Sequence, residues 1–235
     1  KPVRGEWLEG ARRFSLRSAG LRVKRIFDRI KRSAGRTTPT TVEDSRYFTS
    51  MLQEMPDDAQ IARTTWRDRA AQIAAAPADR ERGAQLFAQL WGGDRHVVAL
   101  NADELQRMSH YLEFVQVAAD KEVIAQDELG DYMAIVLEGT LSVDRVQPWG
   151  GRARLAEAHA GDMLGEMSLL DAGARFSSCV TLSTCMLAVV DVRRLDEMIT
   201  QEPRLGVALL ASLSRRLSLR LRQVSARLSA LLSQN

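Results

Sequence analysis

The sequence predicts an α+β fold in which a block of short antiparallel strands is flanked by helices. Apolar runs between Phe114 and Val190 alternate with turns rich in Gly, Asp and Pro, a spacing typical of a sandwich or barrel. On both sides of this block apolar residues recur at helical spacing, and the longest such stretch covers 204–232. The chain of 235 residues, 45% hydrophobic and 27% charged, has the composition of an ordinary globular protein. No apolar run reaches the ~18–20 residues that span a bilayer.

The first 36 residues are a basic arm. They contain twelve Lys/Arg and three Asp/Glu, a balance of +9, so the rest of the chain carries −6 of the total of +3. An amphipathic helix is predicted over 21–32, with an apolar face formed by Val23, Ile26, Phe27 and Ile30. Such a helix binds an anionic membrane, nucleic acid or an acidic groove of a partner protein, or it packs on its own protein or a dimer mate, and all these alternatives stay open.

Residues 37–85 are predicted to form a helical extension. A linker over 33–41 leads into helices over 42–55, 57–76 and 78–90. Pro77 stands at the first position of the last helix, where proline is favoured. Trp66 and Trp91 are expected to be packing anchors.

The strand-rich domain is predicted over 86–200. Asn101 caps an expected helix over 102–112, and a short helix is expected over 191–200. Eight strands are expected between them, at 114–118, 122–125, 132–138, 140–146, 153–158, 163–165, 176–182 and 185–190.

The cysteine content predicts a reducing compartment. Cys179 and Cys185 are the only cysteines, and no secretion signal is visible. We expect buried free thiols and a cytoplasmic protein, at the membrane surface if the basic arm docks there.

The last unit, 201–235, is predicted to be one long helix. Its apolar residues follow each other at spacings of four and three, the pattern of a coiled-coil seam: Leu217, Leu221, Val224, Leu228 and Leu231. This pattern predicts a parallel homodimer through 204–232. The alternative is that the helix folds back onto its own domain.

The stretch 161–180 holds the candidate binding site. Backbone N–H groups around Gly165 can cradle an anion, and the guanidinium of Arg175 offers a planar fork of donors to the same oxygens. The carboxylate of Glu166 only accepts hydrogen bonds, so it suits a hydroxyl group such as that of a sugar. An anion and a hydroxyl bound ten residues apart indicate a nucleotide-like ligand.

This stretch resembles the phosphate-binding cassette of the cyclic nucleotide-binding domain family. The ordered set that carries the resemblance is Gly139, Gly161-Asp162, Gly165-Glu166 and Arg175, and the likeness covers roughly 86–232. The resemblance implies an eight-stranded antiparallel β-roll with flanking helices, extended here by N-terminal helices and a long C-terminal dimerisation helix.

The resemblance also implies the ligand contacts. Glu166 would accept from a ribose 2′-hydroxyl, Arg175 would pair with exocyclic phosphate oxygens, and the N–H groups of Met167, Ser168 and Phe176 would complete the cradle. The long helix would close over the base. Cyclic AMP is favoured, with cyclic GMP and cyclic di-GMP as alternatives, and no metal is expected. A surface arginine that pairs with Glu166 is the alternative for Arg175.

Three departures from the family pattern concern the base and the loop. Phe176 replaces the usual small residue, and Ser177 is the first small one. Asp127 replaces a usual glycine. The family's base-contacting hydroxyls fall at Arg220 and Leu221, which cannot reproduce them.

The sequence therefore predicts a non-enzymatic cyclic nucleotide sensor that signals through dimer or partner-protein contacts. One alternative is a cyclic di-GMP receptor on the same fold. Another is a protein like the transcription regulators, which would bind nucleic acid through its basic arm, because the chain stops at Asn235 without a helix-turn-helix. The three histidines have no ligand spacing, and no nucleophile–base pair is visible.

Overall fold

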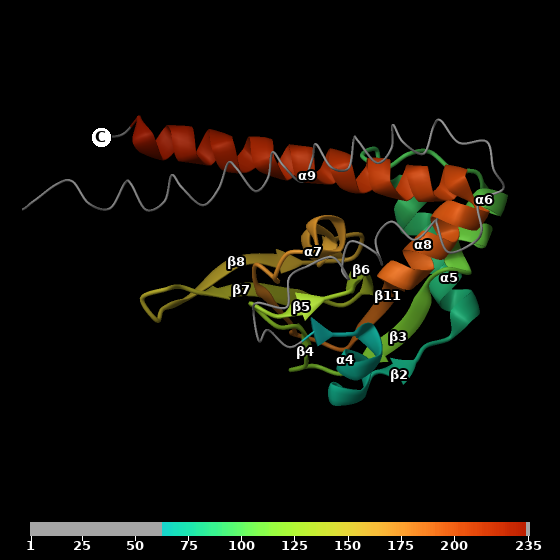
Figure 1. Cartoon of the computed structure of the whole chain (residues 1–235), viewed down its shortest axis with the longest axis horizontal. Coiled ribbons are helices and arrows are strands. Elements are labelled where there is room, and N and C mark those ends of the chain that lie inside the picture. The colour runs from blue at the N-terminus through green and yellow to red at the C-terminus, as the bar shows by residue number, and fades with distance from the viewer. Residues whose placement is uncertain (1–62, 234–235) are drawn as a thin grey trace, which may run out of the picture. The chain divides into compact units, whose positions relative to one another are not determined.

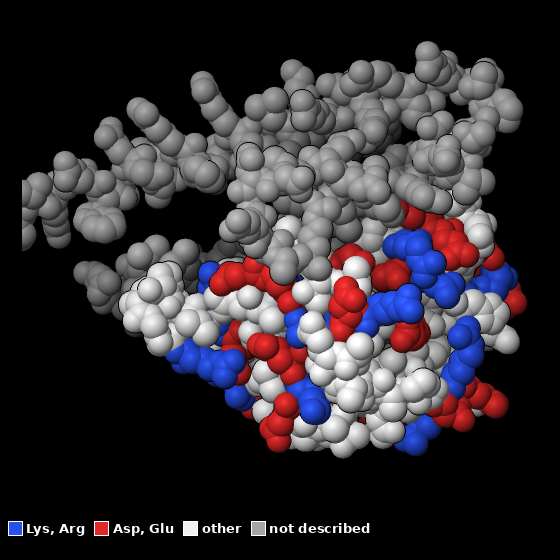
Figure 2. Space-filling view, turned by 60° about the horizontal axis from the view of Figure 1, so that its bottom comes forward, with Lys and Arg blue, Asp and Glu red and all other residues white. Residues whose placement is uncertain are grey.

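The structure, a computed structural model, describes residues 63–233. The basic arm over 1–36, the linker and the helix predicted over 42–55 lie outside the described residues. Acidic and basic side chains are interspersed over the face that Figure 2 presents. Within the described range, no helix is long and apolar enough to cross a membrane.

The strands form two antiparallel sheets and one short parallel pair. The four-stranded sheet has the order β4-β10-β7-β8, the five-stranded sheet has the order β2-β3-β11-β6-β9, and β1 pairs with β5. Their bounds are β1 (Arg63–Thr64), β2 (Ala76–Pro77), β3 (Glu113–Val117), β4 (Glu122–Ile124), β5 (Leu129–Gly130), β6 (Tyr132–Glu138), β7 (Leu141–Val146), β8 (Arg152–Ala158), β9 (Met163–Leu164), β10 (Ser178–Thr181) and β11 (Cys185–Asp191).

All eight expected strands are present, in a roll flanked by helices (Figure 1). The interior strand β6, between β11 and β9, is apolar at nearly every position because both of its faces are covered. Tyr132, Ala134 and Val136 belong to the core between the two sheets. Met133, Ile135 and Leu137 belong to the core between the five-stranded sheet and the helices. Both cysteines are buried free thiols, as expected.

The helices cover one face of the five-stranded sheet. They are α5 (Arg80–Gly93), α6 (Ala102–Ser109), α8 (Val192–Gln201) and the start of α9 (Pro203–Leu232). Asn101 caps α6 through a capping box with Glu104, as expected, although α6 ends three residues before the predicted Leu112. Trp91 is a buried anchor whose indole donates to Val98 O (2.9 Å).

The prediction of one helix over 57–76 is wrong for its described part. Only α4 (Trp66–Gln72) is helical there, with β1 before it and β2 after it. Thr65 starts α4 through a capping box with Asp68, and Ala74 ends the turn at a positive φ of 51°. Pro77 does not open a helix: it lies in edge strand β2, where proline is tolerated, and Asp79 caps α5 instead.

The long helix α9 has two different halves. Leu205, Leu209 and Leu213 are buried in the helix-covered core, and Ser212 Oγ accepts from Val98 N (2.9 Å). From Ser218 to Ser233 every residue is exposed. The expected helix over 204–232 is confirmed. Its first half packs onto its own domain, whereas its second half is exposed and contacts the domain through the ion pair of Arg220 with Glu166.

Close packing of α8 on α9 gives a stability prediction. A Cβ at Gly206 would lie 2.6 Å from Ile199 Cγ1 and 3.0 Å from Ile199 Cα. We therefore expect Gly206→Ala to lower the free energy of unfolding by about 1–3 kcal/mol, the usual cost of overpacking. Urea unfolding followed by circular dichroism measures it. The matched control is Gly92→Ala in α5, where a Cβ would meet no atom within 4 Å. Since alanine is the better helix former, that variant should be unchanged or more stable, and an equal loss in both variants would contradict the packing argument.

Candidate functional site

The cassette predicted from sequence is a strand, a glycine turn, a short helix and a loop. Strand β9 leads to Gly165, which caps α7 (Glu166–Asp171) in the left-handed conformation with φ of 78°. A Cβ at Gly165 would also lie 2.5 Å from Arg175 Nη1. Both the backbone conformation and the space therefore require glycine here.

Arg175 lies inside the domain and not on its surface. Only 2% of it is exposed. Its Nη1 donates to Gly165 O (2.8 Å) and its Nη2 to Tyr132 O (2.6 Å). The alternative of a surface arginine paired with Glu166 is therefore wrong.

The guanidinium of Arg175 carries a charge that the described residues do not neutralise directly. No carboxylate among them forms an ion pair with it, and its buried Nε has no hydrogen-bond partner. Burial lowers the pKa of Arg175, but a guanidinium remains protonated in proteins. Because an isolated buried charge is costly, this arrangement favours an anionic ligand.

Tyr132 and Gly130 shape the space around this guanidinium. The ring of Tyr132 lies 4.6 Å from Arg175 Cζ, a cation–π contact, and its hydroxyl donates to Val123 O (2.5 Å). Burial raises the pKa of Tyr132 to about 12, so the phenol is neutral at physiological pH. A Cβ at Gly130 would lie 2.7 Å from Arg175 Cζ, so glycine leaves the guanidinium its room.

Glu166 is held by the long helix. Its Oε1 accepts from Arg220 Nη1 at 2.9 Å, so α9 contacts the start of α7 (Figure 1). The carboxylate is buried, whereas the side chain of Arg220 is 56% exposed. The acceptor that sequence assigned to a ribose hydroxyl is therefore occupied by a side chain of the same chain.

The remaining predicted residues lie around this centre. Ser168 is buried at the first turn of α7, Met167 is exposed, and Ser177 is half-buried. Phe176 is exposed and its ring lies 4.2 Å from Arg145 Cζ. Leu221 is exposed on α9. The structure thus brings Gly165, Glu166, Arg175 and Arg220 together, whereas Leu221 points into solvent.

Sequence reasoning missed Gly130, Tyr132 and Arg145. Gly130 ends β5, a two-residue strand that has no periodicity to detect. A glycine two residues before an aromatic residue at a strand start was the only available signal for Gly130 and Tyr132.

Other candidate centres in the described residues are weaker. No group of three or more His, Cys, Asp or Glu among them could hold a metal ion. A hollow of about 290 Å³ lies elsewhere, lined among others by Trp66, Arg80 and Arg193. No cassette residue lines this hollow, and the buried charge of Arg175 makes the cassette the stronger candidate.

Comparison with known proteins points to the region that contains the cassette. The family model described as cyclic nucleotide-binding domain matches residues 114–202. A CRP-like cAMP-activated global transcriptional regulator of Mycobacterium tuberculosis (strain H37Rv) is 34% identical over 95 residues, which are 40% of this chain and 42% of that protein. The chain therefore spans less than half the length of the curated relatives it matches.

Two crystal structures show the same fold. A cyclic nucleotide-binding domain from Methylobacillus flagellatus aligns with a TM-score of 0.60 and 23% identity, over 65% of this chain and 85% of that one. The Thermus thermophilus catabolite activator protein aligns with a TM-score of 0.52 and 27% identity, over 60% of this chain and 62% of that one. Over residues 114–202, this chain is thus similar to the cyclic nucleotide-binding domain family.

Proposed function

We propose that this chain is a non-enzymatic regulator that binds a cyclic nucleotide in the cassette. The observation that carries the proposal is the buried guanidinium of Arg175, which has no carboxylate partner among the described residues. A cyclic phosphate supplies the missing negative charge, and Arg175 pairs with its exocyclic oxygens. Glu166 accepts from the ribose 2′-hydroxyl. These groups bind and orient a ligand, and the cassette's described residues include no nucleophile–base pair, so the role is binding and not catalysis.

Cyclic AMP is the proposed ligand. The related regulator of Mycobacterium tuberculosis is cAMP-activated by name, and the phosphate–ribose contacts are those that cyclic AMP needs. Cyclic GMP and cyclic di-GMP present the same phosphate chemistry and are the alternatives. The exposed ring of Phe176 next to Arg175 is positioned to contact a base, so we assign base selection to this side of the site.

Calorimetric titration with cyclic AMP, cyclic GMP and cyclic di-GMP tests the proposal. We expect Arg175→Ala to raise the dissociation constant by roughly 10- to 150-fold, because a charge-assisted hydrogen-bonding pair is worth about 1.5–3 kcal/mol. Arg193→Ala is the control at the other hollow and should leave the affinity unchanged. If the unmodified chain gives no heat with any of the three ligands, the proposal fails. If Arg193→Ala weakens binding and Arg175→Ala does not, the ligand binds in the other hollow and the proposed site is wrong.

Arg220 acts in this scheme as a competitor for Glu166. The ribose hydroxyl and Arg220 Nη1 use the same carboxylate, so ligand entry separates α9 from α7 at this contact. A partly exposed ion pair contributes little free energy, and its loss is correspondingly inexpensive.

We expect Arg220→Gln to tighten nucleotide binding by about two- to fivefold, the equivalent of an exposed pair worth up to about 1 kcal/mol. The matched control is Arg222→Gln, an exposed arginine on the same helix, which should leave the affinity unchanged. Competition binding with a fluorescent cyclic AMP analogue measures both. A weaker affinity of Arg220→Gln would instead make Arg220 a direct ligand contact.

The exposed half of α9 is proposed to form a parallel homodimer. Leu221, Val224, Leu228 and Leu231 stay exposed on it at coiled-coil spacing. Large apolar side chains that recur along one stripe of a helix are typical of an interface.

We expect Leu228→Lys/Leu231→Lys to be a monomer in sedimentation velocity at micromolar concentration, because two charges in a coiled-coil seam cannot be buried. The control Gln223→Lys/Ser229→Lys adds the same charge off the seam and should stay dimeric. A dimer of unchanged sedimentation coefficient in the seam variant would place the interface elsewhere.

A further inference from the structure

Two carboxylates lie near the guanidinium of Arg175 without pairing with it. They are Glu128 and Asp131, and the charge of each stabilises the protonated guanidinium. Both are engaged by residues 63–72, the segment of β1 and α4 that precedes the matched family domain. We call these residues the docked segment.

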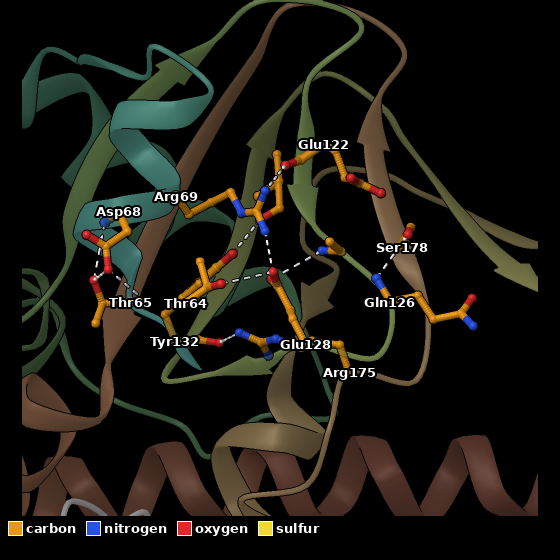
Figure 3. A network of polar contacts seen from close by, with 12 residues as sticks. Thr64, Thr65, Asp68, Arg69, Glu122, Gln126, Glu128, Tyr132, Arg175 and Ser178 are labelled. Atoms are coloured by element: carbon orange, nitrogen blue, oxygen red, sulfur yellow. Dashed lines mark hydrogen bonds and ion pairs between the residues drawn. The ribbon is translucent and has the colours of Figure 1, made fainter. Parts of the chain in front are cut away.

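The carboxylate of Glu128 accepts from Arg69, from Thr64 and, through Oε1, from Ala125 N (3.3 Å). Arg69, a buried residue of α4, forms an ion pair with Glu128 Oε2 and donates to Glu122 O (3.4 Å). Thr64 Oγ1 donates to the same Oε2 at 3.1 Å. Figure 3 shows the Glu128 carboxylate turned toward Arg69 and Thr64, while the guanidinium of Arg175 turns to Tyr132 O.

Asp131 is held by the backbone of the same segment. Its Oδ1 accepts from Trp66 N at 3.0 Å, and the indole of Trp66 lies 5.1 Å from the ring of Tyr132, centroid to centroid. Trp66 therefore contacts the same tyrosine ring on which Arg175 rests.

The backbone fixes Glu128 beside Arg175. Arg175 N donates to Glu128 O (2.8 Å), and β1 pairs with β5 so that Thr64 is opposite Gly130. A free carboxylate in this position would pair with the buried guanidinium, because such a pair removes an uncompensated buried charge. A guanidinium already paired with a carboxylate has fewer donors and less charge for a phosphate.

We propose that the docked segment keeps Arg175 available to the ligand by engaging Glu128, with Arg69 as the positioning residue. This inference rests on the proposed function, since the ligand is the cyclic nucleotide phosphate. Arg69 acts through Glu128 and does not contact the ligand. Through Arg69, the docked segment thus acts on the binding site although it lies outside the family match.

Calorimetry with cyclic AMP on the full chain tests the inference. We expect Arg69→Gln to raise the dissociation constant about tenfold, within the range of coupling energies between contacting residues. Glu128→Gln alone should bind as tightly as the unmodified chain or slightly tighter. The double variant Arg69→Gln/Glu128→Gln should recover the original affinity, because the competing charge is gone. The matched control Arg67→Gln, an exposed arginine of the same helix, should change nothing.

A purely structural role gives a different pattern. If the docked segment only stabilises the fold, the double variant stays as weak as Arg69→Gln, and that result overturns the inference. A loss of affinity in Glu128→Gln alone also overturns the inference. The titration of Glu128→Gln remains a valid test if Arg69→Gln does not fold. Arg69→Lys keeps a cation at Glu128 and should retain most of the affinity.

A ligand-free measurement separates this inference from the proposed function. The Nε–H signal of Arg175 in a proton–nitrogen correlation spectrum, assigned with Arg175→Lys, reports whether a carboxylate contacts the guanidinium. We expect it to shift in Arg69→Gln and to return in the double variant, without any nucleotide. An unmoved signal overturns the inference even if cyclic AMP binds. A moved signal, with no nucleotide bound by the unmodified chain, supports the charge arrangement and refutes the proposed ligand.

Discussion

The guanidinium of Arg175 is placed in the interior of the roll, and much of the local structure follows from accommodating it. Two carbonyl groups accept its hydrogen bonds, an aromatic ring lies against its face, and two glycines leave space for it. Each of these is a feature of the strands and turns that carry the cassette. Burying a charge without a counter-charge is unfavourable, so the position of Arg175 is not explained by a contribution to stability. Under the proposed function, this charge binds the anion of the cyclic nucleotide.

The charge balance of the site extends beyond the family domain. Glu128 and Asp131 are carboxylates whose charge stabilises the protonated guanidinium of Arg175. Glu128 is bound by Arg69 and Thr64, and Asp131 is bound by the backbone of Trp66. The two-residue pairing of β1 with β5 would be a weak interaction alone, but it lies where these side chains meet. The docked segment and the roll are therefore one electrostatic unit. A domain boundary drawn at the start of the family match would separate Arg69 from Glu128, with which it forms an ion pair.

The sequence predicted what is periodic or local, and missed what depends on distant contacts. The eight strands followed from alternation and turns, because side chains of a strand face two environments. The turn at Gly165 and the position of Arg175 followed from local spacing. Strands β1, β2 and β5 have two residues each and carry no pattern. The prediction of a helix over 57–76 is wrong in its described part because the pairing of β1 with β5 and of β2 with β3 overrides helix propensity on both sides of α4. The pairs Arg220–Glu166 and Arg69–Glu128 join residues more than fifty positions apart, so only the folded chain reveals them.

The position of Arg220 links the ligand site to the exposed half of α9. Up to Arg216, which pairs with Asp94, the helix is anchored to the domain by buried apolar residues and polar contacts. Arg220 makes the next contact, with Glu166, and from there the helix is surrounded by solvent. A ligand changes the population of helix arrangements only by its differential affinity for them. Under the proposed function, that difference arises where the ribose hydroxyl and Arg220 require the same carboxylate. Because the contact lies at the last attachment of α9, a change there alters the direction of the free half and not the packing of the core. The same helix carries the proposed dimer seam, so a local exchange of hydrogen bonds at Glu166 is sufficient to couple nucleotide binding to the geometry of the dimer.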